Sequence, residues 1–121
     1  MEIRPPSKIY LKDSPLHGLG VFCSEEIQFN EIIDTCPFLL FPHKRHEKLP
    51  FFHNYAFCWP KGDNWVNHVL TMGYGSYYNH SEQANVGWES DVELNVFIFK
   101  SLRKIKVGEE LFIDYGNGVK F

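Results

Sequence analysis

Apolar and polar residues alternate along several short stretches of the chain, and this period-two pattern predicts β-strands. The stretch at 94–99 is the clearest, because it alternates and contains β-branched residues. The stretches at 20–23 and 31–36 are typical of two short strands around a turn, and a turn at 106–108 precedes the last stretch. Strands are expected at 8–12, 20–23, 31–36, 38–41, 94–99 and 110–115.

Helical patterning is confined to one region of the chain. The only plausible helix lies near 47–57, and Pro50 weakens it because proline disrupts a helix interior. Strands do not alternate with helices, which excludes cofactor-binding folds of the Rossmann type. The pattern therefore predicts a mostly β fold with many short strands and little helix.

Composition places the chain among globular proteins. Its 121 residues are 44% hydrophobic and 22% charged, and no repeat, low-complexity tract or linker interrupts them, so 1–121 is expected to form a single domain. No apolar run approaches the ~18 residues of a membrane helix, and the start lacks the apolar region of a signal peptide. We therefore expect an intracellular, soluble protein with no membrane partner.

Charge, cysteine and aromatic content narrow the classes of function. A formal net charge of -3 argues against direct binding to nucleic acid, which depends on neutralising phosphates, and suits a basic partner weakly. Cys23, Cys36 and Cys58 are too few and too scattered for a disulfide framework or a thiolate zinc cluster. Aromatic residues reach 17%, and they supply either core volume or the walls of a slot for cations and flat rings.

The segment 14–22 carries the first candidate chemistry. Gly18 and Gly20 flank Leu19 just before an apolar strand, so the backbone there can approach a ligand closely. No helix is predicted to follow, which excludes phosphate binding by helix amides. A plain hairpin turn is the more common meaning of two such glycines.

Two further segments carry polar and aromatic groups. In 73–81, three tyrosines precede Asn79 and His80, whose donors and acceptors can fix the polar edge of a small ligand or cap a turn. In 108–116, a buried strand ends on Tyr115, whose hydroxyl is either presented at a site or satisfied within the core.

The order and spacing of these segments resemble the SET domain of protein-lysine methyltransferases. The resemblance covers about 14–116 and rests on Gly-x-Gly, on Asn-His-Ser and on Gly-Glu-Glu-Leu-x-x-x-Tyr-Gly. The stretch 73–81 with Asn85, and the stretch 54–57, are most similar to the minimal SET proteins of viruses and bacteria. The resemblance implies small β-sheets around a C-terminal pseudoknot, and transfer of a methyl group from S-adenosylmethionine to the lysine amine of a protein substrate, histones among the candidates.

The resemblance also implies roles for particular residues. Tyr115 is expected beside the transferring methyl group as the catalytic residue, and Tyr55, Tyr74 and Tyr78 are expected as walls of the channel for the substrate lysine, although each could equally be core. The residues expected to bind the cofactor are His17, Gly18, Leu19, Gly20, Asn79, His80, Tyr115 and Phe121.

The chemistry explains why such residues are useful. The sulfonium is already a strong electrophile, so the protein must chiefly align a neutral amine with the S–CH₃ bond. A free lysine has a pKa of ~10.4 and must lose its proton first. A dry aromatic slot beside a cation disfavours the ammonium form, and no metal is required.

Other interpretations are open at this point. A zinc site could be drawn through His43, His46, His53 and Cys58, but the spacing fits no closed tetrahedral pattern. A hydrolase built on Ser81, His80 and Asp114 lacks a nucleophile elbow, and adjacent Ser and His side chains rarely point at one another. The main alternative to the enzyme is a SET module that binds a protein tail or the cofactor without turnover.

The resemblance is incomplete at the end of the chain. The cysteine-rich segments that flank many SET domains have no counterpart here, and only 116–121 follow Tyr115. So few residues cover a lysine channel poorly, and Phe121, the substrate or a second subunit could complete it. We expect a homodimer whose interface lies near this segment, because self-association would hide the exposed aromatic surface.

Overall fold

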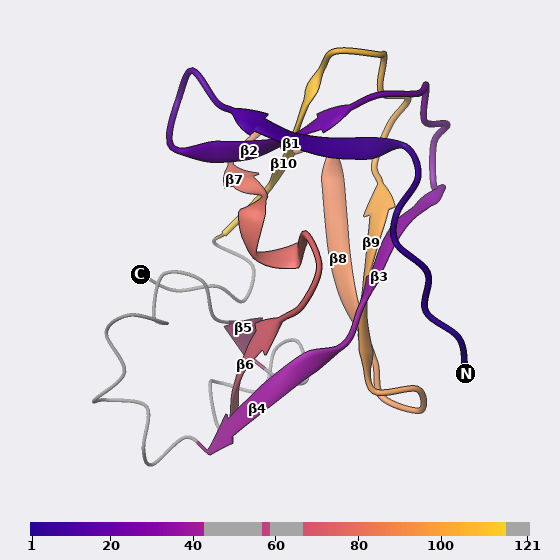
Figure 1. Ribbon diagram of the computed structural model, residues 1–121, viewed down its shortest axis with the longest axis vertical. Helices are drawn as coiled ribbons and strands as arrows, with labels where there is room; N and C mark the ends of the chain where they lie inside the picture. The colour runs from indigo at the N-terminus through magenta and orange to yellow at the C-terminus, as the bar shows by residue number, and fades with distance from the viewer. Residues whose placement is uncertain (43–56, 59–66, 116–121) are drawn as a thin grey trace.

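The computed structural model describes residues 1–42, 57–58 and 67–115, and it arranges them in three small β-sheets (Figure 1). The first sheet has the order β1 (Ile9–Asp13), β2 (Leu19–Cys23), β10 (Glu110–Ile113) and β7 (Asn79–His80). The second has the order β3 (Ile32–Cys36), β9 (Val96–Ser101) and β8 (Val86–Asp91). The third has the order β4 (Phe38–Pro42), β6 (Asn67–Thr71) and β5 (Phe57–Cys58). This confirms the mostly β fold of several small sheets.

The predicted strands are confirmed as β1, β2, β3, β4, β9 and β10, with ends that shift by one or two residues. The strand expected from Leu94 begins only at Val96, because Asn95 adopts a left-handed backbone (φ 57°) in the turn after β8. The stretches 20–23 and 31–36 do not form one hairpin, since β2 pairs with β1 and β10 whereas β3 pairs with β9. The helix expected near 47–57 lies outside the described residues, except that Phe57 begins β5.

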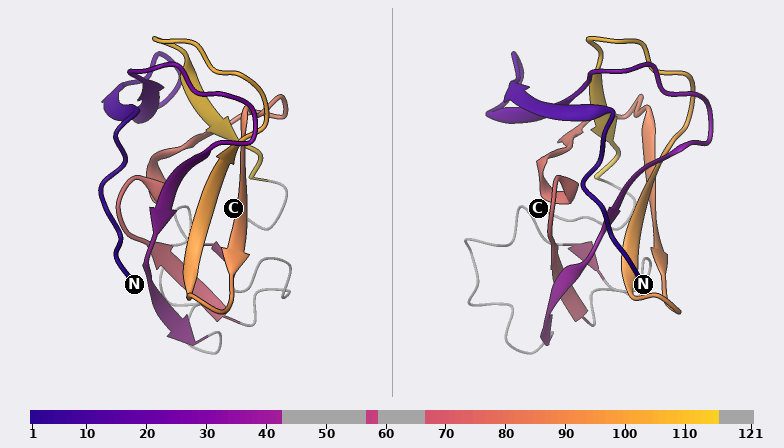
Figure 2. Two further views of the ribbon diagram at one scale, coloured as in Figure 1. Left: turned by 90° about the vertical axis from the view of Figure 1, so that its right-hand side faces the viewer. Right: turned by 45° about the vertical axis from the view of Figure 1, so that its right-hand side comes forward.

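The C-terminal strand β10 brings distant parts of the chain together. It pairs antiparallel with β2 on one side and parallel with β7 on the other, where Phe112 lies opposite Asn79. The Ser81 amide then donates to the Ile113 carbonyl (3.0 Å). Figure 2 shows β7 and β10 side by side from two directions. The Gly-x-Gly segment, where β2 begins, and the Asn-His segment are therefore held at the two sides of one strand.

Large aromatic side chains fill the core between the sheets. Phe97 and Phe99 of β9 are fully buried, and the ring of Phe57 meets Trp88 edge-on with centroids 4.8 Å apart. The ring of Tyr78 stacks on Phe99 at 4.7 Å. Rings of this size bury much apolar surface per residue, so these aromatic residues stabilise the small fold.

The short 3₁₀ helix η2 (Gly75–Tyr77) leads from the third sheet into β7. Its tight turn requires a small residue, because a Cβ on Gly75 would collide with the side chain of Thr71. Among the residues that the structure describes, no helix has the length and apolar character needed to cross a bilayer.

One buried carboxyl makes the stability of the fold depend on pH. Burial raises the pKa of Asp34, although hydrogen bonds from the Cys36 thiol and from the Thr35 and Tyr74 amides oppose that shift. Folded Asp34 thus keeps its proton at pH values where the unfolded chain has lost it. Its stabilising contribution is complete below pH 3.8, the ordinary value, and is lost as pH rises through the folded pKa.

We therefore expect the free energy of unfolding of the wild type, minus that of Asp34→Asn, to fall as pH rises from 3.8 towards neutrality. The amide cannot ionise, so other titrating groups largely cancel in this difference. Urea unfolding of both proteins at a series of pH values measures it. A difference that stays constant over this range contradicts the raised pKa.

Candidate functional site

The first wall of the candidate site is the turn between β1 and β2. The Ser14 amide donates to the Gly18 carbonyl (2.7 Å), and the Ser14 hydroxyl accepts from the Leu16 amide (3.1 Å). Gly18 has φ +47°, and a Cβ built there meets no atom within 4 Å, so this backbone borders open space. Gly20 is buried instead, because it faces β10 and Asn79.

Asn79 fastens this turn to the second half of the chain. Its side-chain amide donates to the His17 carbonyl (3.2 Å) and to Glu110 Oε2 (2.9 Å). The His17 contact spans 62 positions of the sequence. Asn79 is buried, so its donors act within the protein. It therefore sets the shape of the backbone around Gly18.

Glu110 completes this network. Its Oε2 accepts from Asn79, and its Oε1 accepts from the Ser14 hydroxyl (2.9 Å). A Cβ at Gly20 would collide with Oε2, so this position requires glycine while the carboxylate stays in place. Hydrogen bonds to an ionised acceptor are stronger than neutral ones, and here they join β10, β7 and the turn before β2.

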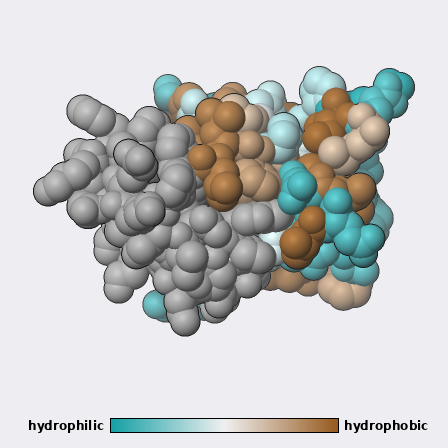
Figure 3. Space-filling view, turned by 90° about the horizontal axis from the view of Figure 1, so that it is seen from below, coloured by the Kyte–Doolittle hydropathy of each residue, from teal (hydrophilic) through white to brown (hydrophobic). Residues whose placement is uncertain are grey.

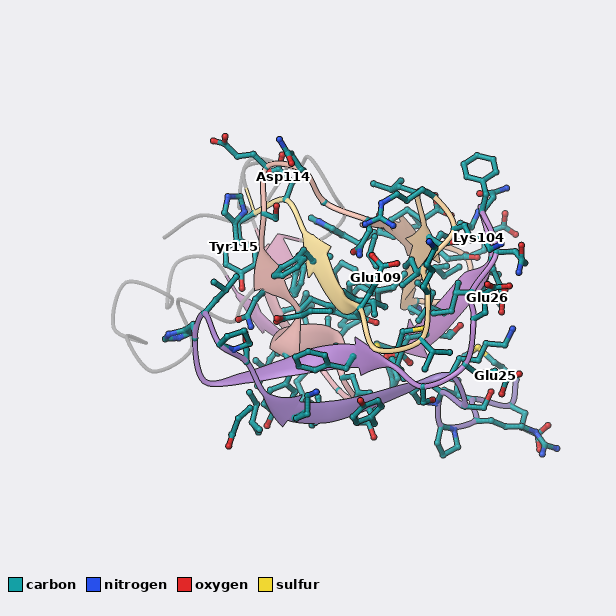
Figure 4. All side chains as sticks on the ribbon, turned by 90° about the horizontal axis from the view of Figure 1, so that it is seen from above. Glu25, Glu26, Lys104, Glu109, Asp114 and Tyr115 are labelled. Carbon is teal, nitrogen blue, oxygen red and sulfur yellow. The ribbon has the colours of Figure 1, made fainter. Side chains whose placement is uncertain are left out.

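Glu109, the residue before β10, makes its side-chain contacts outside this network. Its carboxylate accepts from the Lys106 amide and from Arg103 (3.0 Å). The Lys106 amide, with help from Arg103, lowers the pKa of Glu109. Figure 4 shows Glu109 toward the side where Lys104 and Glu26 lie, whereas Tyr115 lies at the opposite end of β10. Glu109 therefore closes a turn, whereas Glu110 accepts the hydrogen bonds that hold the candidate site together.

The second wall is formed by His80 and Tyr115, whose rings lie 5.0 Å apart between centroids. The Tyr115 amide donates to His80 Nδ1 (2.9 Å). An accepting Nδ1 belongs to a neutral imidazole that carries its proton on Nε2. Asp114 Oδ1 lies 3.8 Å from this Nδ1, and because the ring is neutral in this arrangement the two groups do not form an ion pair.

The Tyr115 hydroxyl is oriented by the backbone. It donates to the carbonyl oxygen of Tyr78 at 2.7 Å. Because its proton is used in this bond, the remaining lone pairs of the oxygen can only accept. A half-buried acceptor in a fixed direction can align an amine or polarise an adjacent methyl group. It is not arranged to act as an acid.

Asn85 supports the strand beneath the site. Its side-chain amide donates to the Glu110 carbonyl (2.9 Å), and its Oδ1 accepts from the Phe112 amide (2.7 Å). Asn85 is fully buried, and its side-chain amide supplies β10 with the donor and the acceptor that a neighbouring strand would otherwise provide. Its role is to hold β10.

The structure brings together His17, Gly18, Leu19, Gly20, Asn79, His80 and Tyr115, which the sequence predicts as site residues. The backbone of Leu19 takes part, since its carbonyl lies 3.5 Å from the Asn79 amide. Tyr55 and Phe121 lie outside the described residues. Sequence reasoning missed Ser14 and Glu110 as site residues, although both lie within the motifs that it singled out.

The predicted channel tyrosines differ in their surroundings. Tyr74 is half-buried and packs against the core at the start of η2. Tyr78 is only 1% exposed, so its ring occupies the core, which is the alternative that the sequence left open. What Tyr78 offers to the site is its carbonyl oxygen.

The two alternative chemistries are a hydrolase centred on Ser81 and a zinc site through His43, His46, His53 and Cys58, and only the first lies wholly within the described residues. The Ser81 hydroxyl accepts from the Gln83 amide (3.0 Å) and so closes a turn. Among residues 1–42, 57–58 and 67–115, no three His, Cys, Asp or Glu side chains converge as metal ligands. His43, His46 and His53, the ligands of the zinc alternative, lie outside these residues.

The sequence of the chain matches a known protein family. Residues 18–116 match the model of the SET domain family. A curated protein of Schizosaccharomyces pombe, the histone-lysine N-methyltransferase specific for H3 lysine-37, is 34% identical over 98% of this chain and 79% of its own length.

Solved structures agree in fold. A Plasmodium falciparum protein assigned as a histone methyltransferase superimposes with a TM-score of 0.75 and 32% identity, over 96% of this chain and 97% of that one. The Polycomb Repressive Complex 2 of Chaetomium thermophilum gives a TM-score of 0.80 at 21% identity, over 98% of this chain and 16% of that one. That likeness shows the fold alone.

Proposed function

Since this chain belongs to the SET domain family, we propose that it is a protein-lysine methyltransferase that transfers a methyl group from S-adenosylmethionine to a lysine of a histone. The observation that carries the proposal is the oriented Tyr115 hydroxyl, held by the Tyr78 carbonyl next to the Asn79–Glu110 network. A module that only binds would not need a polar group fixed at this point.

The residues present fit the cofactor. The backbone at Gly18 borders open space, and the Asn79–Glu110 network fixes its shape from behind. The His80 imidazole is partly exposed and keeps Nε2–H as a donor. Carbonyl oxygens, one ring donor and an aromatic face suit a small cation with an amino-acid end. The backbone from His17 to Gly20 would hold that end, with Asn79 and His80 beside it.

When bound, S-adenosylmethionine supplies an electrophilic methyl group on a sulfonium. The chain supplies orientation and a dry surrounding. The Tyr115 oxygen accepts from the substrate amine and so directs its lone pair along the transfer axis. We propose that Tyr74 contributes to a wall that strips water from the lysine and favours its neutral form.

We propose a histone as substrate because the Schizosaccharomyces pombe relative is named for a histone lysine and aligns over most of both chains. The net charge of -3 is compatible with a basic histone tail. Recombinant histones, labelled S-adenosylmethionine and chelator-treated buffer test this directly. We expect label on one histone, with the modified lysine identified by mass spectrometry.

Two results would contradict the proposal in different ways. Saturable cofactor binding with no label on any histone or lysate protein indicates a module that binds without turnover. Absence of cofactor binding by the folded protein in the same buffer contradicts the assignment of the whole site. The chelator keeps any metal from contributing to either result.

We also propose that the working form is a homodimer, with an interface on β4; the interface expected near the C-terminal segment falls on 116–121, outside the described residues. Leu39 and Leu40 of β4 are 54% and 51% exposed, and β4 pairs on one side only within the described part of the third sheet. Figure 3 shows apolar residues exposed on the lower face of the molecule. Apolar side chains and an open strand edge favour self-association.

Sedimentation equilibrium at micromolar concentration tests this proposal, and we expect twice the chain mass. Leu39→Lys combined with Leu40→Lys is expected to shift the equilibrium towards monomer, whereas the same change at exposed Val92, in the β8–β9 turn, is the control. A wild-type monomer that methylates short peptides at full rate contradicts the dimer.

A further inference from the structure

The imidazole of His80 holds the backbone of Tyr115. β10 ends at Ile113, whose carbonyl accepts from the Ser81 amide, so Tyr115 lies beyond the strand. The Tyr115 amide donates to His80 Nδ1 at 2.9 Å, and the two rings lie 5.0 Å apart between centroids. The Tyr115 hydroxyl donates to the Tyr78 carbonyl at 2.7 Å. These two bonds fix Tyr115 at its backbone and at the tip of its ring.

The bond between His80 and the Tyr115 amide exists in one protonation state only. Nδ1 accepts a hydrogen bond in the neutral ring, whereas both nitrogens of an imidazolium carry protons and can only donate. After protonation, two N–H groups would point at each other across this short distance. Histidine changes its charge between about pH 5 and pH 8. The His80 side chain is 39% exposed, so protons from solvent reach it.

Asp114 offers the protonated ring another partner. β7 pairs with β10, and in the described part of the chain the titratable groups in contact with the His80 ring are Asp114 and Tyr115, just beyond the end of β10. Figure 4 shows both residues at this end of the strand. Asp114 Oδ1 lies 3.8 Å from Nδ1. A proton on Nδ1 therefore exchanges the hydrogen bond from the Tyr115 amide for an ion pair with Asp114.

We infer that His80 is a pH-sensitive positioning residue for methyl transfer: its neutral imidazole holds Tyr115 at the reacting centre, and a proton on Nδ1 releases it. This inference rests on the proposed function. The proton comes from solvent, an N–H bond forms at Nδ1, and the hydrogen bond from the Tyr115 amide breaks. Nε2 carries its proton in both states, so the change acts at the Tyr115 amide.

Single-turnover kinetics at saturating cofactor and substrate test the inference. Because the substrate lysine also takes up a proton as pH falls, every variant slows at low pH. The quantity compared is therefore the ratio of the rate constant at about pH 5.5 to that of the same protein at about pH 8.5. We expect this ratio to be about tenfold smaller in the wild type than in His80→Asn. Asparagine places an acceptor oxygen at the position of Nδ1 and does not take up a proton.

Two further variants separate positioning from other effects. His80→Gln carries its carbonyl one bond further from the backbone and leaves the Nδ1 position without an acceptor, so its rate constant at about pH 8.5 should fall below that of His80→Asn. His17→Asn removes the other histidine of the site and should keep the wild-type ratio. Equal ratios in the wild type and His80→Asn overturn the inference.

A second readout depends neither on turnover nor on the folding of a His80 variant. In the wild type, the amide proton signal of Tyr115, assigned with Tyr115→Phe in ¹⁵N-tyrosine-labelled protein, should move to higher field as the His80 ring signal titrates, since the amide loses its acceptor. An amide signal that does not follow the ring overturns the inference. A signal that follows it, without methyl transfer to any histone, contradicts the proposed function while the link between His80 and Tyr115 stands.

Discussion

Tyr115→Phe is expected to reduce methyl transfer by a factor on the order of 10²–10³ while the fold and the affinity for S-adenosylmethionine stay nearly unchanged. The Tyr115 hydroxyl is the group that the Tyr78 carbonyl orients at 2.7 Å, and phenylalanine removes only that oxygen. The ring contact with His80 is retained, and so is the hydrogen bond that the backbone amide of residue 115 donates to His80 Nδ1.

Three measurements on one preparation check this expectation. Turnover with a histone substrate should fall, calorimetry should give a wild-type dissociation constant for the cofactor, and thermal unfolding should be unchanged within a few degrees. Turnover at the wild-type rate would reduce Tyr115 to a packing residue. A parallel loss of cofactor affinity would instead place the hydroxyl in the cofactor site.

Gly20→Ala is expected to weaken cofactor binding about 10- to 100-fold. The new methyl group would occupy the position of Glu110 Oε2 and crowd the Asn79 amide. Glu110 must then release Asn79, Ser14 or both, and the turn around Gly18 loses the bonds that fix its shape.

Gly87→Ala is the matched control for this change. Gly87 also lies in a β-strand, but a Cβ there meets only the end of the exposed Leu102 side chain, which can move aside. We expect calorimetry to give wild-type affinity for Gly87→Ala and a clear loss for Gly20→Ala at equal folded fraction. Equal affinity for the cofactor in both variants would show that the Gly-x-Gly turn does not contribute to cofactor binding.

Local periodicity predicts β1, β2, β3, β4, β9 and β10, but it misses β8, which is as long as β9. It fails where neighbours impose the strand. β7 has only two residues, Asn79 and His80, and is extended because β10 lies beside it. β8 contains Gly87 and the polar run Glu89, Ser90 and Asp91, and it forms a strand through its pairing with β9. Pairing energy, absent from the local sequence, decides both cases.

The two glutamates of the C-terminal motif show the same limit within the site. Neighbouring residues of an extended chain face opposite sides, but this does not say whether Glu109 or Glu110 faces the site. That assignment depends on β2 and β7, which flank β10 and come from elsewhere in the chain. Only the assembled sheet places Glu110 against Ser14 and Asn79.

The sequence by itself determined the mostly β fold, the family and the set of motifs, because these depend on residue types and their order. The tertiary structure decided how each motif acts. It turned the ring of Tyr78 into the core and its carbonyl toward Tyr115, and it joined Asn79 to a carbonyl 62 positions away. Such contacts arise from the register of distant strands, and no local pattern encodes that register.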